Sequence, residues 1–138
     1  MIMPGPNSRI LLVDDSALMR SIEREALAMS SLAPLEFVEA SDGAEALERL
    51  AESEFLLVVT DYQMPSVDGL ALTEQIRAHA STAVRALPVV LVSSNRDADL
   101  MVRSRRAGAN AFLRKPLDAE VLVSTVQRLL SATNVAPT

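Results

Sequence analysis

Residues 55–65 read FLLVVTDYQMP, and this stretch decides the fold. Its first five residues are apolar without interruption, which predicts a strand buried on both faces. The run ends at Asp61, and Pro65 followed by Asp68 and Gly69 predicts a loop. Asp61 therefore lies where a central strand ends, and open α/β sheets bind ligands at the carboxyl ends of their strands. We predict that Asp61 is the reactive residue.

The composition predicts one globular domain with an aliphatic core. The chain has 138 residues, of which 49% are hydrophobic and only 3% aromatic. A net charge of −5 argues against direct binding of nucleic acid, which requires a basic face. The absence of cysteine excludes disulfides and thiolate metal sites. No apolar run reaches the length of a membrane span and no signal peptide is recognisable, so we expect a cytoplasmic protein without membrane contact.

Outward from residues 55–65, apolar runs and helical periodicity alternate along the chain. We expect a loose arm at 1–8, a domain at 9–131, and a tail at 132–138 that leaves no space for an output domain. The only histidine, His79, lies in an expected loop at 79–87 and receives no role. The expected strands are 10–13, 35–40, 55–60, 88–92 and 111–114, and the five expected helices are 16–29, 44–52, 70–78, 97–107 and 117–131.

The buried faces of two helices can also be predicted from periodicity. Leu18, Ile22, Ala26 and Met29 form one apolar stripe on helix 16–29, away from Glu23. In the last helix we expect burial of Val121, Leu122, Val126, Leu129 and Leu130.

Strict alternation of strands and helices predicts a parallel sheet with helices on both faces. Polar residues follow four of its strands: Asp14 and Asp15, Asp61, Ser93, and Lys115. The carboxyl ends of parallel strands share one edge, so these side chains should meet there. Each residue alone could instead cap its own helix or pair at the surface. The recurrence at successive strand ends favours a shared site.

Three carboxylates in one place repel each other. Two like charges about 4 Å apart cost on the order of 4 kcal/mol at an effective dielectric of 20. A hard divalent cation such as Mg²⁺ relieves this repulsion with oxygen ligands, and no cluster of softer ligands is present. A cation, Lys115 and Ser93 around a carboxylate form a receptor for a phosphoryl group, and aspartate is a recognised phosphoryl acceptor.

Six motifs in order make the chain similar to the receiver domains of two-component response regulators, in particular single-domain chemotaxis regulators. The similarity covers residues 9–131 and implies a flavodoxin-like, doubly wound, five-stranded parallel sheet in the order 2-1-3-4-5. It also implies a signalling domain that promotes only its own phosphorylation and dephosphorylation, not an enzyme. The motifs are ILLVDDS at 10–16, EASDGAEAL at 39–47, VTDYQMP at 59–65, DGL at 68–70, LVSS at 91–94 and KP at 115–116.

The resemblance implies a role for each residue at the site. Asp61 accepts a phosphoryl group from a phosphohistidine of a sensor histidine kinase or phosphotransfer protein. Asp15, Asp61 and the backbone carbonyl of Gln63 bind Mg²⁺, and Asp14 assists through water. Lys115 contacts the phosphoryl oxygens, and its peptide bond to Pro116 is usually cis in the family.

Two further residues are implied to act as a switch. Ser93 moves to hydrogen-bond the phosphoryl group, and Phe112 holds the aromatic position that rotates inward behind it. Both couple to the face formed by helix 97–107, strand 111–114 and helix 117–131, where a downstream protein or a phosphorylation-dependent dimer partner would bind. For Phe112 the alternative role is core packing. The same face carries four arginines, which could instead form an ordinary solvated surface. They are Arg103, Arg105, Arg106 and Arg114.

Two departures from the family pattern bear on the function. Gln63 stands where asparagine is frequent and borders the site, which affects how long the phosphorylated form lasts. Phe112 stands where tyrosine is frequent and lacks the hydroxyl. One alternative keeps the fold but makes the chain a pseudo-receiver, an interaction scaffold that is never phosphorylated. Another is a haloacid-dehalogenase-type phosphatase, but that family expects an aspartate where Gln63 stands.

Overall fold

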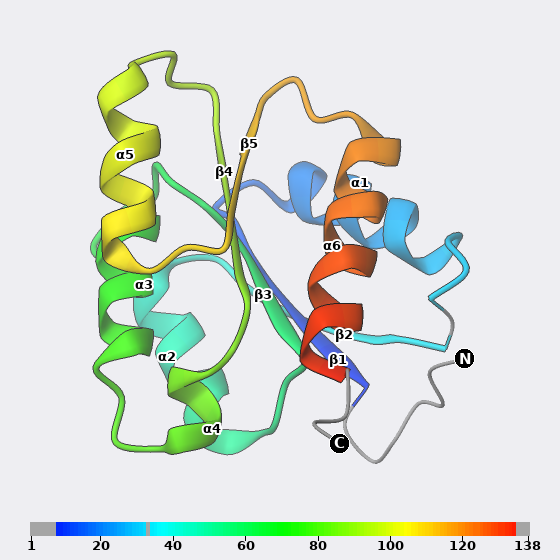
Figure 1. Ribbon diagram of the computed structural model, residues 1–138, viewed down its shortest axis with the longest axis horizontal. Coiled ribbons are helices and arrows are strands. Elements are labelled where there is room, and N and C mark those ends of the chain that lie inside the picture. The colour runs from blue at the N-terminus through cyan, green and yellow to red at the C-terminus, as the bar shows by residue number, and fades with distance from the viewer. Residues whose placement is uncertain (1–7, 33, 135–138) are drawn as a thin grey trace.

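A computed structural model describes residues 8–32 and 34–134 of the chain. Five parallel strands form one sheet in the order β2-β1-β3-β4-β5 (Figure 1), which confirms the predicted topology. The predicted arm at 1–8 and tail at 132–138 lie largely outside the described residues, and the last helix continues to Asn134. The strands are β1 (Arg9–Val13), β2 (Glu36–Ala40), β3 (Leu57–Asp61), β4 (Val89–Ser93) and β5 (Ala111–Arg114).

Helices cover both faces of the sheet. In Figure 1, α1 and α6 lie to the right of the sheet and α2, α3 and α5 to its left. The described residues contain one helix more than the five predicted, the short α4, which begins after its N-cap Ser81 in the expected loop. Four residues are too few to show helical periodicity. The helices are α1 (Ala17–Ala28), α2 (Gly43–Glu52), α3 (Gly69–Arg77), α4 (Thr82–Arg85), α5 (Ala98–Ala107) and α6 (Ala119–Asn134).

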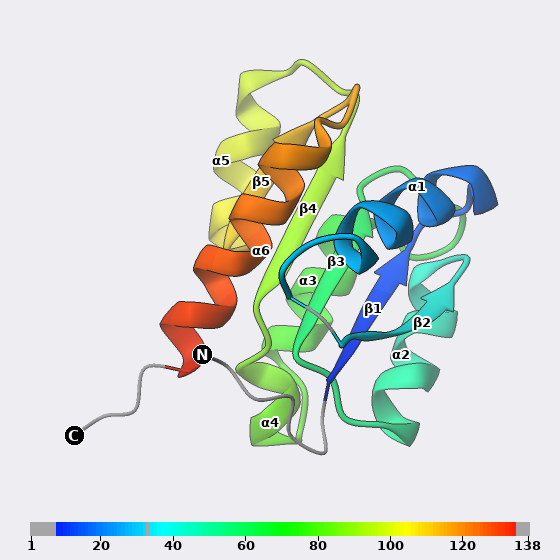
Figure 2. The ribbon, with the colours of Figure 1, turned by 90° about the vertical axis from the view of Figure 1, so that its right-hand side faces the viewer.

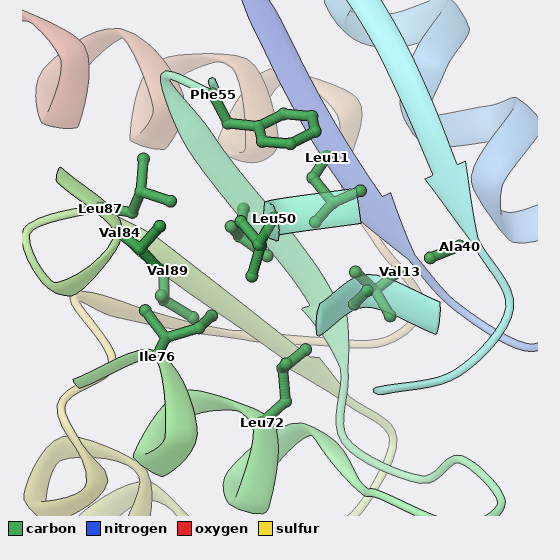
Figure 3. Close-up of a cluster of buried hydrophobic side chains, with 12 residues drawn as sticks. Leu11, Val13, Ala40, Leu50, Phe55, Leu72, Ile76, Val84, Leu87 and Val89 are labelled. Atoms are coloured by element: carbon green, nitrogen blue, oxygen red, sulfur yellow. The ribbon is translucent and has the colours of Figure 1, made fainter. Parts of the chain in front are cut away.

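The three central strands send alternate side chains into two separate aliphatic cores. Leu11 and Val13 of β1 point toward α2 and α3, where they pack with Leu72 and Ile76 (Figure 3). Their neighbours Ile10 and Leu12 point the other way, into a core that α1 and α6 complete. Both faces of β1, β3 and β4 are therefore buried, as the unbroken apolar runs predict.

Two predictions about helix faces are wrong. Leu18, Ile22 and Met29 of the expected apolar stripe are 70%, 42% and 81% exposed, whereas Glu23 and Leu27 are buried. The sheet and α6 meet α1 on a neighbouring arc, and periodicity alone does not choose between two arcs that both carry apolar residues.

Val121 is the second error, since it is 44% exposed, while the other four residues expected to be buried in α6 are buried. It lies in the first turn of α6.

The carboxyl ends of the parallel strands lie at one edge of the sheet, at the top of Figure 2. A cleft of about 820 Å³ lies at the opposite edge, lined among others by Arg9, Phe55 and His79. None of the residues predicted to act on phosphate lines that cleft. None of the helices within 8–32 and 34–134 combines the length and apolar character needed to cross a bilayer.

Candidate functional site

Asp61 is the last residue of the central strand β3 and is 6% exposed. Its position is held by the backbone on either side. The Tyr62 N–H donates to the Val92 carbonyl of β4 at 2.9 Å, and the Gly69 N–H donates to the Tyr62 carbonyl at 2.8 Å. The strand therefore ends in a loop that is bonded back onto the sheet and onto the start of α3.

Gly69 is a residue whose importance the sequence analysis missed, because it registered only as part of a turn. A Cβ atom at this position would lie 2.2 Å from the Asp61 carbonyl oxygen and 2.9 Å from Leu91 Cδ1. No side chain fits there without moving the backbone of Asp61. Glycine thus allows α3 to begin directly against the end of β3.

Asp14 and Asp15 follow β1 and precede α1. The helix is capped by Ser16, whose hydroxyl accepts the Met19 N–H, so neither carboxylate is the N-cap. The Asp14 Oδ1 accepts the Ser16 N–H at 2.9 Å. Asp14 is 1% exposed, while Asp15 is exposed. The alternative that these acids merely cap α1 is therefore not supported.

The structure brings the three carboxylates and Lys115 together. One oxygen from each of Asp14, Asp15 and Asp61 lies within 4.8 Å of the others. The Lys115 Nζ lies 2.9 Å from Asp61 Oδ1 and 3.7 Å from Asp14 Oδ2. Lys115 reaches this edge from the end of β5, and its peptide bond to Pro116 is cis, as the resemblance implies. Four residues from three strand ends form one charged cluster.

Burial and neighbouring charges shift the pKa of Asp14, Asp61 and Lys115. Burial raises the pKa of Asp14 above its usual value, and the charge of Asp61 adds to the effect. Burial also raises the pKa of Asp61, although the hydrogen bond from Lys115 opposes it. For Lys115, burial alone would lower the pKa, but the hydrogen bond and charge of Asp61 outweigh it and the pKa is raised. Lys115 therefore does not fully offset the cost of burying the Asp14 and Asp61 carboxylates.

The donor set fits a hard divalent cation. Asp14 Oδ2 is buried and accepts no hydrogen bond among the described residues, although Lys115 Nζ lies 3.7 Å away. Beside the carboxylates is a shallow depression of about 410 Å³, lined by Asp15, Tyr62, Gln63, Met64, Pro65 and Asp68. Oxygen ligands next to a solvent-open space suit Mg²⁺, which retains several of its waters.

Ser93 lies beside this cluster, because its backbone carbonyl accepts the Lys115 N–H at 2.9 Å. Ser93 is 2% exposed, and its hydroxyl accepts the Asn95 N–H at 2.9 Å. No hydrogen bond between Ser93 and Asp61 occurs in the described part of the chain. Phe112 is half-buried opposite Leu91, with the Arg114 guanidinium 5.5 Å from its ring centre.

Glu23 is a second residue whose placement the sequence analysis missed. It is 1% exposed on the inner face of α1, and its Oε1 has no hydrogen-bond partner among the described residues. Burial, reinforced by the charge of Asp14, raises the pKa of Glu23 to about 8. The carboxyl group is therefore largely protonated at neutral pH.

The chain is similar over most of its length to proteins of known family. A family model described as response regulator receiver domain matches residues 10–127. The chemotaxis protein CheY of Pseudomonas aeruginosa is 32% identical over 126 residues, which cover 91% of this chain and 98% of that protein. CheY-3 of Vibrio cholerae is 32% identical over 123 residues, covering 89% of this chain and 92% of the relative.

Solved structures show the same architecture. CheY4 of Vibrio cholerae superposes with a TM-score of 0.79 at 26% identity, covering 89% of this chain and 98% of its own. The receiver domain of a signal transduction histidine kinase from Syntrophus aciditrophicus gives a TM-score of 0.82 at 30% identity, covering 95% and 96%.

Proposed function

Because this chain belongs to the response regulator receiver domain family of two-component signalling, a family of switches rather than enzymes, we propose that Asp61 accepts a phosphoryl group. The observation that carries the proposal is the Lys115–Asp61 contact of 2.9 Å within a cluster of three carboxylates. The donor would be a phosphohistidine of a histidine kinase or of a phosphotransfer protein.

The transfer forms one bond and breaks one. An Asp61 carboxylate oxygen attacks the phosphorus, the P–N bond to the donor imidazole breaks, and the imidazole nitrogen keeps the electron pair. The product is an acyl phosphate on Asp61. Lys115 would then exchange its contact with Asp61 Oδ1 for a phosphoryl oxygen, so its ammonium follows the negative charge as that charge moves outward.

Asp15, Asp61 and the Gln63 carbonyl would hold Mg²⁺, with Asp14 assisting. Bound there, the ion would offset negative charge on the phosphoryl oxygens. The support from this chain is the buried Asp14 Oδ2, which accepts no hydrogen bond among the described residues, and the closeness of the three carboxylates. The Gln63 side chain borders the depression where water would approach the acyl phosphate, so we assign it an influence on the lifetime of the phosphorylated form.

Phosphorylation would be read out on the face formed by α5, β5 and α6. Phosphorylation adds roughly −1.5 to −2 charges near pH 7. Ser93, which follows Val92, the sheet partner of Asp61, would turn toward the phosphoryl group, and Phe112 would follow inward. Residues 98–134, which span α5, β5 and α6, contain five arginines besides the site residue Lys115 and only three acids, so this part of a chain of net charge −5 is positive. A downstream protein, or a second copy after phosphorylation, would bind there.

Acetyl phosphate with Mg²⁺ tests the assignment without a kinase. Intact-mass measurement should show one phosphoryl group on the parent protein and none on Asp61→Asn. Asp99→Asn, which removes an exposed acid of α5, is the matched control and should be labelled like the parent. Labelling of Asp61→Asn at the parental level would refute the assignment. A parent that takes up no phosphoryl group would instead support the scaffold alternative.

A further inference from the structure

The loop that carries Asp14 and Asp15 is anchored from three directions. The Asp14 N–H donates to the Ala40 carbonyl of β2 at 3.1 Å, and its Oδ1 accepts the Ser16 N–H. Its backbone carbonyl accepts a short hydrogen bond from Arg20 Nη1 of α1. The first two contacts are local to the sheet and the helix start. The third is made by a charged side chain that the phosphoryl chemistry does not use.

Arg20 is itself held in place by an acid on another strand. Its Nε donates to Glu39 Oε1 of β2 at 2.8 Å, and the Arg20 side chain is 16% exposed. The second oxygen of the same carboxylate, Glu39 Oε2, binds Arg24 Nη2 at 2.8 Å. Glu39 thus receives two arginines from α1, but only Arg20 also reaches the Asp14 carbonyl.

We propose that Arg20 is a positioning residue that aims the Asp15 carboxylate into the cation site. The Asp14 carbonyl belongs to the planar peptide that leads into Asp15, so fixing the direction of that carbonyl fixes where Asp15 departs from the chain. The rigid guanidinium fork can serve two acceptors at once, the Asp14 carbonyl after β1 and the Glu39 carboxylate of β2, which an ammonium cannot match. The inference rests on the proposed Mg²⁺ site.

An electrostatic role and an orienting role of Arg20 predict opposite changes in Mg²⁺ affinity when Arg20 is removed. A cation near a metal site repels the metal, so its loss would tighten Mg²⁺ binding if Arg20 acted only through its field. If Arg20 acts by orientation, its loss weakens binding, by roughly 10-fold on the scale of other residues that orient metal ligands. Arg24→Met removes the same charge from the same carboxylate and leaves the Asp14 carbonyl bond intact.

The experiment is a Mg²⁺ titration of the full chain followed by fluorescence of Tyr62, the only tyrosine in a chain without tryptophan. Arg20→Met and Arg20→Lys should both bind Mg²⁺ about 10-fold more weakly than the parent, and Arg24→Met within about 2-fold of it. Urea unfolding without metal identifies any variant that is not folded. If Arg20→Met does not fold, Arg20→Lys, which keeps the charge, decides the question.

The Mg²⁺ response of the parent protein distinguishes failure of the Arg20 role from failure of the Mg²⁺ site itself. If the parent binds Mg²⁺ and the Arg20 variants bind it as tightly as Arg24→Met does, the positioning role of Arg20 is overturned. If the parent itself does not respond to Mg²⁺, the proposed cation site fails, and this inference fails with it.

Discussion

Replacing Glu23 should stabilise the protein, and more so as the pH rises. The Glu23 carboxyl is 1% exposed, and burial raises its pKa from 4.5 to about 8. The folded state therefore binds a proton that the unfolded chain releases. Stability from this proton is fully present below pH 4.5 and is lost as the pH rises through about 8.

The size of the effect follows from the shift. A difference of 3.5 pKa units at about 1.36 kcal/mol each corresponds to about 5 kcal/mol over the full range. Between pH 5 and pH 9 on the order of 4 kcal/mol of this is lost. Glu23→Gln removes the titration while keeping the shape. Glu23→Leu also removes the unpartnered Oε1 and should add about 2 kcal/mol of stability.

Urea unfolding without metal at several pH values between 5 and 9 measures the effect. The free energy of unfolding of the parent should fall relative to that of Glu23→Gln as the pH rises, with the largest gap at pH 9. Glu25→Gln, an exposed acid on the same helix, is the control and should follow the parent within about 0.5 kcal/mol at every pH. Parallel curves for the parent and Glu23→Gln would refute the reasoning.

Three further predictions concern glycines and the metal. Gly69→Ala should lower the free energy of unfolding by about 3 kcal/mol or more and abolish labelling by acetyl phosphate, because its Cβ would displace the Asp61 carbonyl; retention of parental labelling would contradict this. Gly108→Ala should cost about 1–2 kcal/mol, because Gly108 caps α5 at φ 109°, yet leave labelling intact, and mass spectrometry of the folded variant checks the contrast. Mg²⁺ at about 100 times its dissociation constant should add about 2.7 kcal/mol to the free energy of unfolding, reversibly with a chelator, and an equal gain in Asp15→Ala would speak against the site.

The strands and the cluster could be predicted because their signals are local, whereas the order of the strands in the sheet came only from the resemblance to receiver domains. Apolar runs that end at Val13 and Val59 mark strands buried on both faces, and the acids at the ends of these strands reach one edge in any parallel sheet. The positions of Asp14, Asp61 and Lys115 needed nothing more.

What could not be predicted depends on contacts between distant residues. The buried arc of α1, which takes in Glu23 and leaves Leu18 in solvent, is set by how the helix packs on the sheet and α6. The bond between Arg20 and Glu39 spans 19 residues and two elements, and no spacing in the chain indicates it. The close approach of Gly69 to the Asp61 carbonyl likewise depends on how α3 packs against the end of β3.

Successive side chains of β1 and β3 point into two different cores, and this limits how far the carboxylates at the strand ends can be displaced. A slip of one residue along either strand would exchange the linings of both cores at once and would turn its terminal acid to the wrong side. Small displacements of the acids therefore carry a penalty set by aliphatic packing as far away as Leu11 and Val58. The packing of the two aliphatic cores thus fixes the positions of the carboxylates at the site. Substitutions deep in either core should therefore reduce phosphoryl uptake although they change no polar atom.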